Sequence, residues 1–320
     1  MAQNTSNSSA VIASEIYSRF LVENLPEIML PEGFSRDVTD FGDGTTLNIP
    51  TVGSVTLQEA AEGQPLTFNP IDSGTVTLSI SEFPGDAWSV TDVLKEDGYL
   101  VERLMQERAM ESSRAMAEYF ETKYLDACNS AQTANNDNLV NGIKHRIVGG
   151  SSGAIQLEDF AFMKYSFDKA KVPQAGRIAI VDPIVEYNLN KLMNATWVQN
   201  NPMFSGIVTE GFAQSHKFVT NIFGFDIWTS NLLPTLDSAE SGVKEADGTA
   251  TGASAGDVAN IFMSVASDQT KPIMKAWRRR PTVEAWRDHE ERKDKVQATG
   301  RFGLGAQRLD TLGVILTPAS

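Results

Sequence analysis

The stretch TDVLKEDGYLVERLMQERAMESSRAMAEYFETKYLDACNSA, from Thr91 to Ala131, decides the fold. It contains no proline and begins with Thr-Asp, which favours a helix start. Apolar residues recur along it at helical spacing: Leu94, Val101, Leu104, Met105, Ala109, Met116, Phe120, Tyr124 and Cys128. The pattern predicts a helix of roughly 60 Å, at about 1.5 Å per residue, with a kink near Gly98. Such a helix is typical of a spine that other elements cross.

The segment before this helix has a different pattern. Residues 12–25 could form a short amphipathic helix. Residues 38–90 contain short alternating runs that Gly and Pro interrupt, which predicts β structure. These runs hold too few large side chains for a core of their own, so we expect an extended hairpin that packs on something else.

The segment after the helix alternates between strand and helix patterns. Residues 140–235 include a helix pattern from Leu157 to Lys171, the strand-like RIAIVDP and the helical IVEYNLNKLMN, which together predict a mixed α/β domain. Residues 236–257 are small, polar and rich in glycine, and they predict a mobile surface loop. The remainder is typical of strands joined by polar turns.

The composition is that of a globular protein with an acidic surface. The chain has 320 residues, 41% hydrophobic content, a net charge of −14 and a pI near 4.7. No apolar run is long enough to cross a bilayer, and the N-terminus does not have the pattern of a signal peptide. The single cysteine, Cys128, excludes an internal disulfide and favours a reducing compartment.

The charge is distributed unevenly along the chain. Residues 1–100 hold 15 Asp and Glu against 3 Lys and Arg, whereas residues 271–301 hold 10 Lys and Arg against 5 Asp and Glu. An acidic surface repels nucleic acid. A chain with one acidic and one basic end can attract copies of itself head to tail, or it can pair its charges internally. Charge alone leaves both arrangements open.

The basic end contains KAWRRRPTVEAWRDHEERKD, Lys275 to Asp294. Nucleic-acid binding would need a broad basic face, but five acids are interleaved in its second half, so DNA contact stays the minor alternative. Arg and Trp are typical anchors of protein–protein contacts. We expect subunit contacts between two sets of residues. The basic set comprises Trp277, Arg278, Arg279, Arg280 and Trp286, and the acidic set comprises Asp37, Asp40, Asp43, Glu59 and Glu62.

The sequence contains no convincing motif for catalysis or for cofactor binding. GGSSG, residues 149–153, fits the pattern around a nucleophilic Ser151, with His216 or His289 as base, but several strand–helix units should precede such an elbow. The glycines more simply form a flexible connector. GRFGLG, Gly300 to Gly305, lacks the order of a dinucleotide motif and predicts a bulged or twisted strand.

Metal and thiol chemistry are equally unsupported by the sequence. The acids Asp37, Asp40 and Asp43 lack the spacing of a calcium loop. The histidines His145, His216 and His289 have no partner at metal-ligand spacing. Cys128 lies on the apolar stripe of the long helix, as a packed thiol does. We therefore expect no catalytic residue, no cofactor and no metal, and a protein that is not an enzyme.

The order of the parts, together with three segments, resembles a known family. The segments are IFGFDIWTSNLLP (222–234), RRPTVEAWRDHEERKDKV (279–296) and RFGLGAQRLDTLGVI (301–315). The chain resembles the major capsid protein of tailed bacteriophages, with the Hong Kong 97-type α+β fold. The resemblance implies four parts: an N-terminal arm (1–34), an extended β loop (35–90), a peripheral domain with the spine helix (91–147 and 268–320) and an axial α/β domain (148–267).

The resemblance also implies a function. The chain would self-assemble into pentamers and hexamers of an icosahedral head that encloses double-stranded DNA without sequence-specific binding. It would belong to the virion and assemble in the cytoplasm of the bacterial host. About 30 residues precede the extended loop, so a separate scaffolding protein is expected, beside a portal protein and a decoration protein. No membrane partner is expected. The alternative is an encapsulin-like nanocompartment shell that encloses cargo protein.

Overall fold

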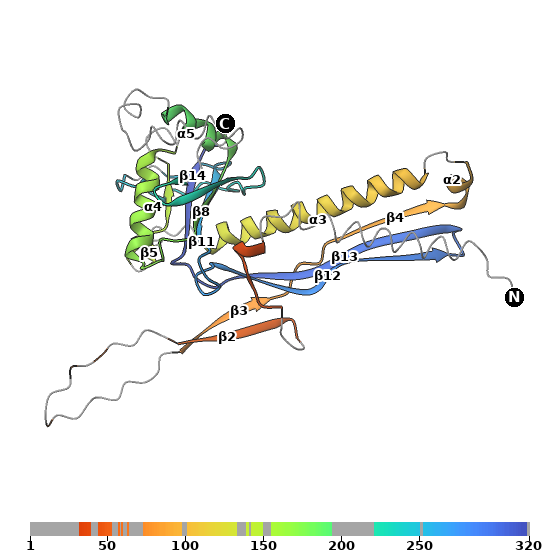
Figure 1. Ribbon diagram of the computed structural model, residues 1–320, viewed down its shortest axis with the longest axis horizontal. Coiled ribbons are helices and arrows are strands. Elements are labelled where there is room, and N and C mark those ends of the chain that lie inside the picture. The colour runs from red at the N-terminus through yellow and green to blue at the C-terminus, as the bar shows by residue number, and fades with distance from the viewer. Residues whose placement is uncertain are drawn as a thin grey trace.

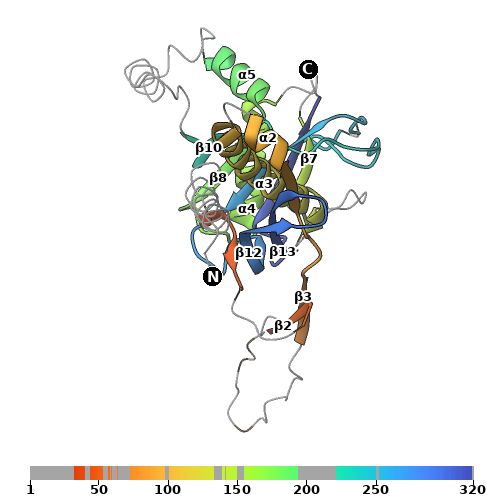
Figure 2. The ribbon, with the colours of Figure 1, turned by 90° about the vertical axis from the view of Figure 1, so that its right-hand side faces the viewer.

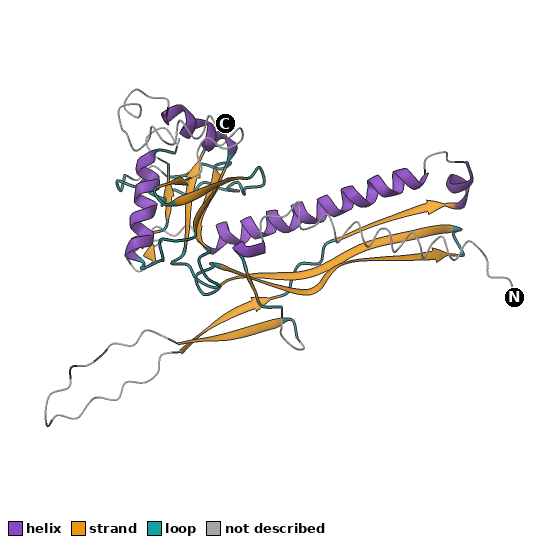
Figure 3. Ribbon diagram, viewed as in Figure 1, coloured by secondary structure: helices purple, strands orange, loops and turns teal. Residues whose placement is uncertain are grey.

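The computed structural model describes most of the chain and shows an elongated body with a projecting hairpin (Figure 1). The described residues are 32–39, 44–52, 57, 59, 63, 73–97, 101–132, 139–140, 142–149, 155–193, 221–249 and 252–318. A long helix lies over long strands in one layer, and a compact α/β layer stands at one end of it. Figure 3 shows that both layers combine helices with strands.

The long helix predicted from the sequence is confirmed. It is α3 (Val101–Ala131), while residues 92–97 form a separate short helix, α2 (Asp92–Asp97), and Gly98, where a kink was expected, lies outside the described residues. Five of the positions predicted to be apolar point into the protein, since Ala109, Met116, Phe120, Tyr124 and Cys128 are all buried. Leu94, on α2, was also expected to be buried and is 51% exposed.

The face of α3 that these residues form lies on a four-stranded sheet with the order β1-β12-β13-β4. Its strands are β1 (Arg36–Asp37), β12 (Ile273–Asp288), β13 (Lys293–Ala306) and β4 (Gly85–Thr91). The region 35–90, expected as the extended loop, thus contributes β1 and β4 to this sheet. Val90 is buried on β4 while its neighbours Ser89 and Thr91 are exposed, an alternation that suits a strand covered on one face.

The expected extended hairpin consists of β2 (Thr46–Val52) and β3 (Ser73–Ser79), which pair antiparallel. Figure 2, which looks along the elongated layer, shows the hairpin on the side of β12 and β13 opposite α3. Most of β3 is exposed. Its Leu78 is fully buried and packs with Met274 and Ala276, so the hairpin packs on the sheet as expected.

The compact layer is built on a six-stranded mixed sheet with the order β7-β14-β11-β8-β10-β9. Its strands are β7 (Arg146–Val148), β14 (Leu312–Thr317), β11 (Val258–Ser264), β8 (Arg177–Val181), β10 (Phe225–Thr229) and β9 (Asn221–Ile222). The helices α4 (Leu157–Lys169) and α5 (Pro183–Met193) share a core with one face of this sheet. The predicted α/β alternation is therefore confirmed. The short strands β5 (Leu139–Val140) and β6 (Ile143–Lys144) pair only with each other within the described residues.

The second face of this sheet joins the two layers. Alternate residues of β8 point to opposite faces, as a strand requires. Ala179 and Val181 contact the core under α4 and α5, whereas Ile178 and Ile180 belong to a cluster with Tyr124 and other residues of α3. The same cluster includes core residues of β12 and β13, so a continuous apolar core runs from one layer into the other.

Two features differ from the sequence-based expectation. Residues 236–257 were predicted to be a mobile surface loop, but the described parts, 236–249 and 252–257, are anchored: Val243 and Ala253 are buried and pack with Leu236 against β11 and β14. The burial of these few apolar side chains holds the segment on the sheet even though most of its residues are polar. The last strand, β14, belongs to the compact layer although it lies within 268–320, because it is apolar and buried throughout and so suits the interior of a sheet.

Candidate functional site

Trp277 lies in the subunit's own core. Its ring stacks on Phe120 of α3 at a centroid distance of 5.2 Å and lies 5.1 Å from the ring of Phe302. Its backbone N–H donates to Thr39 Oγ1 at 3.2 Å, and only 9% of the residue is exposed. Trp277 thus anchors β12 to α3 by packing within its own subunit, which argues against the expected subunit contact at this residue.

The three consecutive arginines lie where β12 is irregular. Its register with β13 shifts between Trp277 and Arg279 and again between Arg279 and Thr282. Such β-bulges re-aim side chains and tolerate proline, which explains the position of Pro281. Arg278 and Arg280 are exposed and Arg279 is half-buried.

A fourth arginine belongs to this group. Arg301 of β13 lies directly opposite Arg279 in the register. Arg279 donates to Thr299 Oγ1, lies 5.6 Å above the ring of Phe83 and is 3.9 Å from Glu284. We call Arg278, Arg279, Arg280 and Arg301 the bulge arginines.

The bulge arginines carry excess positive charge. Within the described part of the chain, Arg280 and Arg301 form no ion pair, and Glu284 is the acid that reaches Arg279. Like charges directly opposite each other on paired strands are destabilising. An anion brought to this surface would therefore relieve repulsion and form charge-assisted hydrogen bonds with the guanidinium groups.

The other half of the basic segment is neutralised within the subunit. Arg287 pairs with Asp92 at 2.7 Å and with Asp294 at 3.5 Å. Lys295 pairs with Asp288 at 2.5 Å, and this hydrogen bond lowers the pKa of Asp288 to about 2. Internal pairing, one of the two arrangements left open by the sequence, thus holds for this half. Trp286, which is 44% exposed, lies on the same strand.

The acidic candidates lie apart from the bulge arginines or outside the described residues. Asp37, on β1, accepts the N–H of Thr39 at 2.9 Å. Asp37 and Glu59 are both exposed, and neither forms an ion pair with a described bulge arginine. Asp40, Asp43 and Glu62 lie outside the described residues. The sequence between Arg36 and Lys95 contains no lysine or arginine, and its acids lie outside β2 and β3, so the hairpin region carries net negative charge although its two strands are uncharged.

Among the described residues, the candidates for chemistry show no feature of a reactive site. His145 is buried against Phe167, its Nδ1 lies 3.0 Å from the carbonyl oxygen of Ile143, and burial lowers its pKa. Burial raises the pKa of the Cys128 thiol. His289 is exposed, while Ser151 and His216 lie outside the described residues.

The described ranges contain neither a metal-type cluster nor a membrane-spanning helix. Three or more His, Cys, Asp or Glu side chains are nowhere grouped there as a metal ion would require. No helix within those ranges combines the length and the apolar character needed to cross a membrane.

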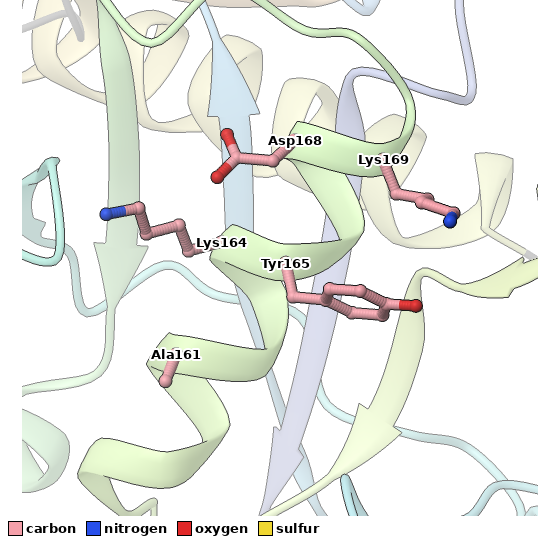
Figure 4. Close-up of a pocket in the computed structure, with 5 residues that line it drawn as sticks. All are labelled: Ala161, Lys164, Tyr165, Asp168 and Lys169. Carbon is pink, nitrogen blue, oxygen red and sulfur yellow. The ribbon is translucent and has the colours of Figure 1, made fainter.

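A shallow depression lies on the exposed side of α4 and is lined by Ala161, Lys164, Tyr165, Asp168 and Lys169. Figure 4 shows that these side chains diverge: Lys164 and Asp168 extend to one side of the helix, and Tyr165 and Lys169 to the other. Asp168 is already paired with Arg177 at 2.6 Å. The depression therefore lacks the convergent polar groups of a ligand site.

Sequence reasoning missed Arg301 and Phe83, since both are far from the arginine triplet in the sequence. The signal for Arg301 is its place next to Gly300 in a segment predicted to be a twisted strand. A pairing of that strand with the arginine segment would have brought the charges together. The register itself depends on two bulges, which the sequence does not reveal.

The fold is shared with solved virus shells. The chain superimposes on the capsid structure of cyanophage P-SCSP1u with a TM-score of 0.64 and 17% identity, covering 90% of this chain and 87% of that one. For the mature capsid of bacteriophage PhiM1 the TM-score is 0.63 at 14% identity, with coverage of 89% and 86%. For the virus-like particle from Pyrococcus furiosus it is 0.54 at 10% identity, with coverage of 94% and 98%. No protein with a curated description matches the sequence.

The sequence itself matches the pattern of a family described as phage capsid protein over residues 73–317 of the 320. This range contains the hairpin strand β3, the spine helix and every strand of both sheets except β1. The chain therefore belongs to the phage capsid protein family, and its fold is the Hong Kong 97-type capsid fold.

Proposed function

We propose that copies of this chain assemble into pentamers and hexamers of an icosahedral head that encloses double-stranded DNA. The observation that carries the proposal is the projecting hairpin, β2 and β3, which exposes most of its strands to solvent. A two-stranded ribbon on its own is marginally stable in water, so its length is best explained by a neighbour that covers it.

The charges favour a head-to-tail contact between copies. The acidic hairpin of one subunit, with Asp37, Asp40, Asp43, Glu59 and Glu62 in and beside it, meets the bulge arginines of the next. Such a heterologous contact generates closed rings when the rotation between copies closes. Each exposed pair contributes only about 0–1 kcal/mol, but the contact repeats at every subunit and fixes the register of the assembly.

The parts of the fold then take the roles expected from the sequence. The elongated layer, expected from residues 91–147 and 268–320, serves as the peripheral domain without β7 and β14, and the compact layer, expected from residues 148–267, serves as the axial domain with both of these strands. Residues 35–90 form the extended loop and residues 1–34 the arm. The partners are a separate scaffolding protein, a portal protein, a decoration protein and packaged DNA, in a virion assembled in the host cytoplasm. The role is structural and not enzymatic.

A second candidate is a compartment that encloses protein cargo. The likeness to the virus-like particle from Pyrococcus furiosus supports a closed shell in general. The sequence match to the phage capsid family over residues 73–317 favours the phage head.

Negative-stain electron microscopy of the expressed chain, with and without a co-expressed scaffolding protein, tests the proposal. We expect closed shells or capsomer rings of uniform size, which require or improve with the scaffold. A monodisperse monomer at high concentration and low ionic strength, even with scaffold, would overturn it. Shells that form without scaffold and copurify with protein cargo would favour the compartment.

A further inference from the structure

Two glycines on β13, Gly303 and Gly305, lie directly beneath the hairpin strand β3. A Cβ atom at Gly303 would lie 2.3 Å from the carbonyl oxygen of Ser79 and 2.8 Å from the Cα of Ile80. A Cβ at Gly305 would lie 2.9 Å from the Leu78 side chain. Two residues apart on a strand, the glycines open the same face of the sheet. They let the backbone of β3 cross β13 more closely than any other residue would allow.

Other contacts fasten the root of the hairpin at this crossing. Leu78 is fully buried there, and the N–H of Ile80 donates to the carbonyl of Thr45 at 2.9 Å. Glu82 and Phe302 exchange two backbone hydrogen bonds of 3.1 Å. The Tyr119 hydroxyl donates to Glu82 Oε2 at 2.5 Å, which ties the root to α3 and raises the pKa of Tyr119 to about 12. The root is thus held to β13 and to α3, whereas β3 from Ser73 to Thr77 is mostly exposed.

We propose that Gly303 and Gly305 are positioning residues, which set the direction in which the hairpin leaves the subunit. The inference deepens the proposed function, on which it rests, because a contact with a neighbour requires the hairpin to leave at one angle. The obstacle at Gly303 is backbone, which cannot rotate away as a side chain can. A methyl group there would have to move β3 from 2.3 Å to the 3.4 Å at which ordinary contact begins. That displacement at the root grows with distance along the hairpin.

Substitutions at Gly303 and at Gly305 should displace the hairpin by different amounts, because different kinds of atom lie above the two glycines. At Gly305 the nearest atom is the end of a leucine side chain, which can change rotamer, so Gly305→Ala should disturb the hairpin less than Gly303→Ala. Gly300 provides the matched control on the same strand. A Cβ at Gly300 would meet its nearest neighbours at 3.7 Å, an ordinary contact distance. Gly300→Ala should therefore leave the hairpin where it is.

The experiment measures the hairpin direction and assembly separately in the full chain. Spin labels on Thr75→Cys, in β3, and Ser89→Cys, in β4, report the distance between hairpin and sheet by pulsed electron paramagnetic resonance. Both positions are exposed, and Cys128 is buried, so the native thiol should not take up label. Unlabelled variants with the single glycine substitutions are tested for shell formation and for thermal unfolding.

We expect Gly303→Ala to shift or broaden the distance distribution by several ångströms and to reduce shell yield at least tenfold, while the protein stays folded. Gly300→Ala should match the wild type in every measurement. An unchanged distance in Gly303→Ala would overturn the inference. So would an equal loss of shells from Gly300→Ala. If Gly303→Ala fails to fold, the distance distribution of Gly305→Ala tests the inference instead, and an unchanged distribution would overturn it. A wild-type chain that forms no shells would overturn the proposed function, while the distances would still test the glycines.

Discussion

Arg146 and Glu240 form a bidentate ion pair, with Nε to Oε2 at 2.8 Å and Nη2 to Oε1 at 2.7 Å. The same guanidinium donates to Asn129 Oδ1 at 2.8 Å and to the carbonyl of Gln132 at 3.0 Å, at the end of α3. Since α3 has no basic residue in its last turn, Arg146 supplies the cation that a helix C-terminus favours. One buried side chain thus joins α3, β7 and the segment before β11.

Removing this guanidinium should strongly destabilise the subunit. The side chains of Arg146 and Glu240 are only 2% and 14% exposed, so Arg146→Met would leave a carboxylate without its partner in a mostly buried site. Breaking a buried pair from one side typically costs about 3–5 kcal/mol. Urea unfolding of Arg146→Met should show a loss of this size in the free energy of unfolding, and Arg146→Met with Glu240→Leu should recover part of it.

The control is an exposed ion pair on α3, the helix whose C-terminal end Arg146 contacts. Arg114 and Glu118 lie one turn apart at 2.8 Å, with side chains 60% and 43% exposed. Arg114→Met should leave the unfolding curve unchanged, because solvent screens such pairs. Equal losses in the free energy of unfolding from Arg114→Met and Arg146→Met would show that the buried ion pair of Arg146 stabilises the subunit no more than an exposed pair does.

The parts of the fold that the sequence predicted are those with a local periodic signal. Along α3, Phe120, Tyr124 and Cys128 follow one another at helical spacing, and all three are buried. In β8, the apolar run IAIV (178–181) is buried throughout, as its composition predicts. These patterns need no knowledge of partners, because period and composition alone specify the element.

The features that the sequence did not predict depend on which segments meet. Trp277 and Trp286 occupy the same place in two Ala-Trp-Arg triplets, yet one is 9% and the other 44% exposed. Because they are nine residues apart on β12 and the two bulges between them cancel, the two rings point to opposite faces of the sheet, and Phe302 fills the space beside only the first. Gly303 likewise matters only because β3 crosses it, a contact between residues more than 200 positions apart. Such pairings leave no periodic mark in the sequence.

The two tryptophans should respond differently to truncation. Trp277→Ala removes a ring packed against Phe120 and Phe302, and it should cost about 3–5 kcal/mol of unfolding free energy. Trp286→Ala removes a side chain that is 44% exposed and belongs to none of the buried clusters, so the cost should be smaller, about 1 kcal/mol. Thermal or urea unfolding measures both. If Trp286→Ala proved as destabilising as Trp277→Ala, the difference in packing would be refuted.

Acid should weaken the subunit through His145. Burial, the largest effect, lowers the pKa of this histidine in the folded protein, although the carbonyl of Ile143 and the neighbouring Asp310 act in the opposite direction. The unfolded chain, with an ordinary pKa of about 6.5, therefore binds the proton more readily. The contribution of neutral, buried His145 to the free energy of unfolding is therefore fully present above about pH 6.5. It is lost as the pH falls from this value towards the lower pKa of the folded state.

His145→Gln removes this proton-binding group, so the decline in unfolding free energy between pH 7 and pH 5 should become shallower. Urea titrations at several pH values measure it. His289→Gln, at an exposed position, should keep the wild-type slope. A wild-type slope in His145→Gln would assign the acid sensitivity to other groups.

Reversing charge at the bulge arginines should weaken assembly without unfolding the subunit. Arg278 and Arg280 are exposed, so glutamate fits at both positions, and it would repel the acidic hairpin of a neighbour. The double variant Arg278→Glu with Arg280→Glu should keep its thermal unfolding midpoint and lose most of its shells in electron micrographs. Lys164→Glu with Lys169→Glu, on α4 of the compact layer, makes the same change in net charge at a distance from the bulge. That control should assemble almost normally, and equal assembly of the two double variants would remove the arginines from the interface.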